Sequence, residues 1–162
     1  MAPSPVPYLK PFSYHGATDF NPCVASAVTS PKAKGASKER SVANLLWDRG
    51  CAVLRGCSSG GGVRKRFVPD VVAVCRGQVL VLELKYRARR AAIRVEGERV
   101  EGLLEFASRA GGRAYVLAKF GRGPWKVFEV GGPGAISING DMYDRAPELD
   151  HLLASIFNKQ LI

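Results

Sequence analysis

Asp70, Glu83 and Lys85 are charged residues that lie inside two short, largely apolar runs that contain several β-branched residues. Burying charge is costly unless the charged groups are paired or bind a metal ion. Carboxylate oxygens are ligands that Mg²⁺ prefers, and water and phosphate oxygens complete its coordination. A neighbouring lysine can orient or deprotonate a water molecule, or balance the charge of a phosphate. We therefore interpret these residues as the catalytic centre of a phosphodiesterase that uses Mg²⁺, for which Mn²⁺ can substitute.

The elements that must position these residues are the runs 67–74 and 79–86. The first is rich in valine and the second in leucine and valine, and the short gap between them contains a glycine, which is typical of a β-hairpin. If the chain reverses at that glycine, Asp70 lies opposite Leu84, whereas a register shifted by one residue places it opposite Glu83. Both registers bring the two carboxylates close together.

Glu83 and Lys85 are two residues apart on one predicted strand, so their side chains lie on the same face of the sheet. The alternative to a catalytic set is a salt-bridged pair at a strand end that faces solvent, because a Glu-x-Lys triplet alone is common. The Pro69-Asp70 pair, its spacing from Glu83 and the strongly basic chain favour the catalytic interpretation.

The chain carries 24 Lys and Arg against 14 Asp and Glu, which gives a net charge of +10. Such an excess is typical of proteins that bind an acidic polymer, most commonly nucleic acid. A protein that is basic for no functional reason, with solvated charge runs, is the alternative. Basic segments flank the acidic motif on both sides, and we expect them to contact the phosphate backbone. The candidates in these segments are Lys38, Arg64, Lys65, Arg66 and Arg87.

Residues 1–33 contain six prolines and no hydrophobic period. We interpret them as a flexible or surface-wrapped extension, or as the product of a misplaced start site. The rest, 34–162, is predicted to be one α/β domain with a mixed central sheet flanked by helices. The expected helices run from 36 to the stop signal at Gly50, over 98–110 and over 147–157; the expected strands are 51–55, 67–74, 79–86, 113–120 and 125–130, with a basic connection at 87–96.

The composition excludes several classes of protein. No stretch approaches the roughly 18 consecutive apolar residues of a membrane span, and the first residues lack the features of a secretory signal. The four cysteines show no metal-binding spacing, and the two histidines lie near opposite ends of the chain. We therefore expect a cytoplasmic protein with buried, reduced thiols and no structural zinc site.

Pro69-Asp70 followed by Glu83-Leu84-Lys85 resembles the motif of the PD-(D/E)xK nuclease superfamily. The succession KGASKER, LWDRGCAVLRGCSSG, VPDVVAV, LELK and LLEFASRAGGRAYVLAKF is similar to the archaeal Holliday junction resolvases, over roughly residues 34–130. The resemblance implies a restriction-endonuclease-like core of the order α-β-β-β-α-β-β. The first 33 residues, the long basic loop before Val68 and the end after Gly131 depart from the family's compact core.

The resemblance also implies roles for individual residues. Glu39 matches an upstream acidic residue that helps to hold the metal, although a favourable charge at a helix N-terminus is the alternative. Asp70 and Glu83 match the metal-binding carboxylates, and Lys85 matches the catalytic lysine. The carbonyl oxygen of Leu84 is implied as a further metal ligand.

Two further pairs of residues follow from the resemblance. Arg40 and Arg55 match basic residues that contact the scissile or neighbouring phosphates, with ordinary surface arginines as the alternative. Ser58 and Ser59 fall where the family carries a mobile Gly/Ser loop beside the catalytic centre, and a loop without a direct role is equally compatible with the sequence.

The implied activity is resolution of four-way DNA junctions in recombination and repair by Mg²⁺-dependent phosphodiester hydrolysis. A symmetric junction has two equivalent strands to cut, and a two-fold dimer supplies two matching sites. A homodimer is therefore implied, in which Phe106, Phe120 or Trp125 would provide apolar contact unless they belong to the core. A nuclease that cuts ordinary duplex DNA and a non-catalytic DNA-binding module of the same fold are the alternative functions.

Overall fold

The computed structural model describes residues 31–56 and 67–158, with side chains from residue 35 onward. The expected extension up to residue 30 lies outside this part of the chain. The predicted DNA-contacting residues Ser58, Ser59, Arg64, Lys65 and Arg66 also lie outside it, as do Cys23 and Cys57.

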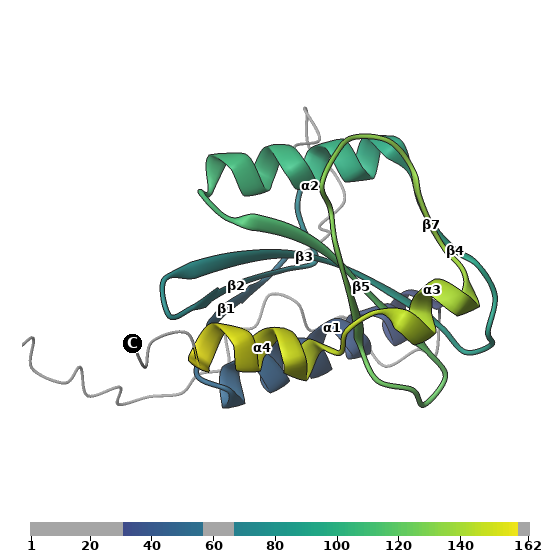
Figure 1. The fold of residues 1–162 in the computed structure, drawn as a ribbon, viewed down its shortest axis with the longest axis horizontal. Helices are drawn as coiled ribbons and strands as arrows, with labels where there is room; N and C mark the ends of the chain where they lie inside the picture. The colour runs from purple at the N-terminus through teal and green to yellow at the C-terminus, as the bar shows by residue number, and fades with distance from the viewer. Residues whose placement is uncertain (1–30, 57–66, 159–162) are drawn as a thin grey trace, which may run out of the picture.

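The centre of the molecule is a five-stranded mixed sheet (Figure 1). One pair of neighbouring strands is parallel and the other three pairs are antiparallel. This arrangement confirms the predicted α/β class. In spatial order the strands are β1 (Ala52–Arg55), β2 (Val71–Cys75), β3 (Gln78–Arg87), β5 (Arg113–Phe120) and β6 (Lys126–Glu129), of which β3 and β5 are the parallel pair.

Helices cover both faces of this sheet (Figure 1). The helices α1 (Pro31–Asp48) and α4 (Leu149–Asn158) lie on one face, and α2 (Gly97–Arg109) lies on the other. Each face has its own apolar cluster of buried side chains. Within 31–56 and 67–158, no helix has the length and apolar character needed to cross a membrane.

The side chains of β3 alternate between these two clusters. Leu82 packs in the cluster beneath α1 and α4, whereas Val81 packs in the cluster beneath α2. Because side chains two residues apart on a strand share a face, Glu83 and Lys85 point to the α2 face with Val81. The predicted common face of Glu83 and Lys85 is therefore confirmed, and α2 is the helix that covers it.

The hairpin between β2 and β3 turns at Arg76 and Gly77, whose φ angles are 52° and 79°. Left-handed conformations at both central residues are typical of the tight hairpin turn that glycine favours. Val71 pairs with Leu82, so the next position in the same register sets Asp70 opposite Glu83. The second of the two predicted registers is therefore the one that the hairpin adopts.

The stretch between the hairpin and α2 contains a strand that the sequence analysis did not predict. β4 (Ile93–Val95) pairs with β7 (Ile136–Ile138) in a separate two-stranded sheet, and α3 (Gly140–Arg145) follows β7. The expectation of a basic connection over 87–96 was wrong for its second half. Three residues are too few to show a strand period in the sequence.

The first helix begins at Pro31, five residues before the predicted start at Ala36. Proline is tolerated in the first turn of a helix because the missing N–H would have no helical partner there. The predicted boundary of the extension at residue 33 therefore falls inside the first turn of α1.

Cys51 and Cys75 form a disulfide, which corrects the expectation that the cysteines are reduced thiols. Ala52 pairs with Val74 in the antiparallel β1–β2 ladder, so Cys51 and Cys75 are the next neighbours across the two strands, with Cα atoms 4.4 Å apart. That separation suits a disulfide. The two cysteines are 24 residues apart in the sequence, so their proximity is not evident there. The pairing of β1 with β2 brings them together.

Candidate active site

Glu83 is the buried charged residue around which the site is built. Its side chain is only 1% exposed, in the middle of β3. Lys85 Nζ donates a hydrogen bond of 2.7 Å to Glu83 Oε1, and the Lys85 side chain remains 34% exposed. The ammonium group can therefore reach a molecule that arrives from solvent while it stays paired with the buried carboxylate.

Asp70 lies just before β2, opposite Glu83. Two hydrogen bonds donated by backbone N–H groups hold it there. The N–H of Leu84 donates to Asp70 Oδ2 at 2.8 Å, and the N–H of Gly56 donates to the Asp70 carbonyl oxygen at 2.9 Å. The first bond fixes the carboxylate and the second fixes its backbone. Asp70, Glu83 and Lys85, which the sequence predicted to lie together, are therefore brought together by the structure.

Pro69 leaves the carbonyl oxygen of Leu84 free of a ladder bond from the opposite strand. In the hairpin register Leu84 is opposite Pro69, which has no N–H to donate. The N–H and C=O of one strand residue point to the same side, and the N–H of Leu84 points to Asp70. The Leu84 carbonyl thus faces the side of the strand on which the Asp70 carboxylate lies.

Arg99 is the residue of this site that the sequence analysis missed. Its Nε donates to Glu83 Oε2 at 2.8 Å, and its Nη2 donates to Asp70 Oδ1 at 3.1 Å. Burial alone would lower the pKa of Arg99, but the hydrogen bond from Arg99 to Glu83 and the two negative charges raise it above its ordinary value. A signal existed in the sequence, because Arg99 precedes Leu103 by four residues, and helical spacing places Leu103 on the apolar face of the predicted helix.

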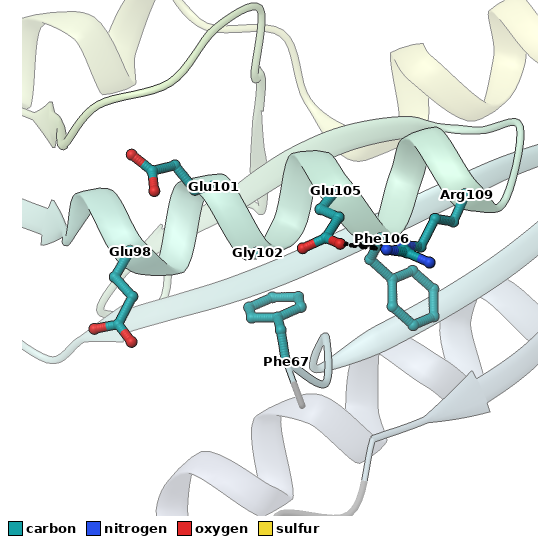
Figure 2. Close-up of a pocket in the computed structure, with 7 residues that line it drawn as sticks. All are labelled: Phe67, Glu98, Glu101, Gly102, Glu105, Phe106 and Arg109. Carbon is teal, nitrogen blue, oxygen red and sulfur yellow. Dashed lines mark hydrogen bonds and ion pairs between the residues drawn. The ribbon is translucent and has the colours of Figure 1, made fainter. Parts of the chain in front are cut away.

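The Phe67 ring contacts both the Arg99 guanidinium and helix α2, and Figure 2 shows it facing α2 near Gly102. The Arg99 guanidinium carbon lies 4.8 Å from the centre of the Phe67 ring, which is within the range of a cation–π contact. The same ring packs against α2 at Gly102, where an added Cβ would come within 2.4 Å of it. The absence of a side chain at Gly102 therefore lets the segment that leads into Asp70 approach the helix closely.

The pKa of the Asp70 carboxyl is raised from 3.8 to about 6. Burial is the largest cause, and the negative charge of Glu83 is the next. The hydrogen bond from Leu84 and the charge of Arg99 act in the opposite direction without offsetting these two effects, and Glu39 raises the pKa further. Asp70 is thus ionised and able to bind a cation near neutral pH, but it loses that ability in mild acid.

Glu39 and Arg55 form a second, adjacent pair. Arg55 Nη2 lies 3.3 Å from Glu39 Oε2 and 3.3 Å from the carbonyl oxygen of Ala36, both on α1. Glu39 is close enough to Asp70 to influence its pKa. Within 31–56 and 67–158, however, no three His, Cys, Asp or Glu side chains are grouped closely enough to hold a metal ion together. A direct metal bond from Glu39 therefore stays a prediction.

The other predicted DNA-contacting residues that the structure describes lie on α1 and β3, the elements that carry Glu39 and Glu83. Lys38 on α1 has its Nζ 4.7 Å from the centre of the Tyr86 ring on β3. Arg40 on α1 and Arg87 at the end of β3 are both exposed. The structure therefore places basic side chains on both elements that carry the acidic residues, without showing what they bind.

The donor set fits a hard divalent cation. Asp70 and Glu83 offer carboxylate oxygens, and Leu84 offers a carbonyl oxygen on the same side of the strand. Mg²⁺ is commonly bound by one or two carboxylates and keeps several water molecules, which phosphate oxygens can replace. An aspartate before one strand and a Glu-x-Lys on its hairpin partner in a mixed α/β sheet together define the PD-(D/E)xK class.

Residues 30–155 match the family model of the archaeal Holliday junction resolvase (hjc). The chain therefore belongs to the archaeal Holliday junction resolvase family, and the resemblance found in the sequence is confirmed. The match extends past Gly131, where the sequence analysis found the resemblance weak. It includes α3 and reaches into α4.

Individual relatives give the same result. The chain is 39% identical over 92 residues to crossover junction endodeoxyribonuclease Hjc of Sulfurisphaera tokodaii, an alignment that covers 57% of this chain and 63% of the relative. It is 35% identical over 99 residues to the protein of the same name from Archaeoglobus fulgidus, covering 61% and 71% of the two chains. The alignment thus spans slightly less than two thirds of the first of these relatives.

The fold of this chain also agrees with its assignment to the family. A solved structure of Archaeoglobus fulgidus Hjc, described as a Holliday junction resolvase from an archaeal hyperthermophile, superposes with a TM-score of 0.62 at 28% identity. The superposition covers 75% of this chain and 96% of that chain. The restriction-endonuclease-like α/β core that was predicted from the sequence therefore has a solved counterpart within the family.

Proposed function

We propose that this protein is a structure-selective endonuclease that resolves four-way DNA junctions by Mg²⁺-dependent phosphodiester hydrolysis in recombination and repair. We further propose that it acts in the cytoplasm, where its DNA substrate would be found in a cell without a nucleus. The observation that carries the proposal is the buried Glu83 carboxylate opposite Asp70, with the partly exposed ammonium of Lys85 beside it. The crossover junction endonucleases among the relatives support the choice of substrate.

The chemistry follows from the positions of the donor groups. Asp70, Glu83 and the Leu84 carbonyl would hold the metal ion, with Glu39 as a further ligand directly or through water. Once bound, Mg²⁺ would polarise a phosphate oxygen and lower the pKa of a water molecule. Lys85, paired with Glu83 through one of its three donors, has donors left to orient the attacking water or to neutralise the phosphate.

The basic residues around the site would hold the DNA backbone. Arg55 is a candidate because it pairs with Glu39 beside Asp70, and its side chain is still 19% exposed. Arg40 and Arg87 are exposed, and Lys38 lies on the same side of the sheet as Tyr86. Contacts of this kind position DNA without reading its sequence. We include in the same surface Ser58, Ser59, Arg64, Lys65 and Arg66 of the loop outside the described residues.

A homodimer would give the two matching sites that a symmetric junction requires. Of the three aromatic residues considered for its interface, Phe120 and Trp125 are buried in the two cores. Phe106 is only half-buried and lines a hollow on α2 together with Phe67 and Arg109 (Figure 2). We therefore propose that Phe106 lies at the dimer interface.

The test is a cleavage assay with Mg²⁺ on a four-way junction and on linear duplexes of the same sequence. We expect the junction to be cut at least tenfold faster than the duplexes. Glu83→Gln should lower the cleavage rate by about 10³-fold, the scale of losing a principal electrostatic group of an active site. Glu129→Gln is the matched control, because Glu129 is an exposed glutamate on β6 that pairs with Arg113 away from the site and from the hollow on α2.

The outcomes separate the alternative functions. Equal rates on junction and duplex would replace the proposal with a nuclease of ordinary duplex DNA. Junction binding without Mg²⁺-dependent cleavage by the wild-type protein would identify a non-catalytic binding module. Full activity in Glu83→Gln would reject this metal site.

A further inference from the structure

Arg99 lies where a cation bridging Asp70 and Glu83 would lie. Its guanidinium donates to one oxygen of each carboxylate, Glu83 Oε2 and Asp70 Oδ1. The other two carboxylate oxygens are held by different groups, Glu83 Oε1 by Lys85 and Asp70 Oδ2 by the N–H of Leu84. The two oxygens that a shared cation would most readily bridge are therefore those that Arg99 already holds.

The charges of this cluster are balanced without a metal ion. Asp70 and Glu83 supply two negative charges, and Lys85 and Arg99 supply two positive charges within ion-pair distance of them. Like charges repel strongly where little water screens them, and Glu83 is 1% exposed. A divalent ion added between the carboxylates would therefore compete with the Arg99 guanidinium for space and for charge.

Of the two positive residues, Arg99 is the one that can move away. Lys85 and Glu83 are on the same strand and side by side, so the lysine adjusts only locally. Arg99 reaches the site from α2 on a long side chain that is 36% exposed, and its guanidinium rests on the Phe67 ring without a further ion pair to an acidic residue of α2. Rotation about the side-chain bonds of Arg99 would turn its guanidinium toward solvent. The positive charge would then remain next to the site.

We infer that Arg99 is an internal counter-cation, which holds Asp70 and Glu83 together in the metal-free protein and must be displaced before a divalent ion binds between them. The inference rests on the proposed metal site and goes beyond it, because it assigns to a residue outside the PD-(D/E)xK motif control over the affinity for the ion. The metal-free site is then closed by an ion-pair network, and the metal-bound site has Arg99 turned outward.

Calorimetric titration of Mn²⁺ into the metal-free full chain, without DNA, tests this inference. Arg99→Gln should bind Mn²⁺ about tenfold more tightly than the wild type, because the competing charge is gone. Arg99→Lys keeps the charge but cannot bridge both carboxylates as a planar guanidinium does, so its affinity should lie between the two. Arg113→Gln is the control, because Arg113 is an exposed arginine on β5 that pairs with Glu129 outside the site and the hollow on α2, and it should bind like the wild type.

The possible results distinguish a failure of the role proposed for Arg99 from a failure of the proposed metal site. An affinity of Arg99→Gln that equals or falls below that of the wild type would overturn the role of Arg99 while leaving the metal site intact. Absence of Mn²⁺ binding by the wild type and by both Arg99 variants would overturn the metal site itself, and the inference with it.

A measurement on the wild-type protein avoids dependence on the folding of a variant. In a ¹⁵N spectrum the Nε–H of Arg99, assigned by its absence in Arg99→Lys, should exchange slowly with water in the metal-free protein because it is hydrogen-bonded to Glu83. Saturating Mg²⁺ should shift this signal and speed its exchange. An Nε–H signal that stays unchanged at saturating Mg²⁺ would show that Arg99 is not displaced, which contradicts the inference.

Discussion

Asp70 is subject to opposing influences. Burial and the neighbouring Glu83 disfavour its negative charge, whereas the N–H of Leu84 and the guanidinium of Arg99 favour it. The first pair prevails, which raises the pKa of Asp70 to about 6. The carboxylate that begins the motif therefore changes its protonation state within the mildly acidic range.

This shift would make binding of a divalent ion at the proposed site dependent on pH. Below pH 6 a proton must leave Asp70 before the ion can bind, so affinity should fall as the pH falls, by about tenfold per unit. Above pH 6 Asp70 is already ionised, and affinity should level off. Calorimetric titrations of Mn²⁺ at pH 5, 6 and 7 measure this dependence.

The control for this prediction is Asp70→Asn, which should bind Mn²⁺ weakly. A plot of its Mn²⁺ affinity against pH should show no change of slope near pH 6. A wild-type affinity that is constant between pH 5 and pH 7 would contradict the prediction. Such a result would mean that Asp70 is ionised throughout that range.

At the scale of elements, β1 and β2 are joined both by their ladder and by the Cys51–Cys75 disulfide. Both cysteines are buried, with exposures of 3% and 0%. The bond closes a loop that contains the basic segment before Asp70, so it limits how far the two flanks of that segment can separate. Disulfides inside cells are rare except in proteins of hyperthermophiles; the expectation of reduced thiols followed the general rule.

Removal of the disulfide should lower the free energy of unfolding by about 3 kcal/mol, the value for closing a loop of this length. Urea denaturation under oxidising conditions measures this loss in Cys51→Ala, in Cys75→Ala and in the double variant. If the two cysteines act through one bond, each single variant should lose nearly as much as the double variant. Losses that simply add would contradict the bond.

At the scale of the whole molecule, a chain with a net charge of +10 positions a small acidic cluster beneath one helix of an α/β sheet. The positive charge outside the cluster would attract the DNA backbone, and the paired positive residues within it would limit the repulsion between the carboxylates and that backbone. A second copy would supply the second cut of a symmetric junction. The hollow on α2 is the surface at which we expect that copy to bind.

Phe106→Ser should therefore shift the protein from dimer to monomer in sedimentation equilibrium at micromolar concentration. Loss of a half-buried aromatic anchor at an interface commonly weakens association by about 2 kcal/mol or more. Trp47→Ser is the matched control, because Trp47 is an aromatic residue with 65% exposure on α1. A monomeric wild type, or a dimer that survives in Phe106→Ser, would reject the assignment of this surface.

The sequence alone determined the features that depend on neighbours along the chain. The two short apolar runs and the glycine between them predicted the β2–β3 hairpin, and the hairpin is sufficient to bring Asp70, Glu83 and Lys85 together. The spacing of apolar residues likewise predicted α2. These features are local because strand alternation and helical period repeat within a few residues.

Only the tertiary structure decided which residues meet across long separations. Arg99 reaches Glu83 because α2 packs over one face of the sheet, and Cys51 meets Cys75 because β1 pairs with β2. The pairing of β4 with β7 joins segments that are each only three residues long. Contacts of this kind are set by the packing of whole elements, which no periodicity in one segment records. The sequence therefore specified the three charged residues of the site, and the fold added the arginine that balances them.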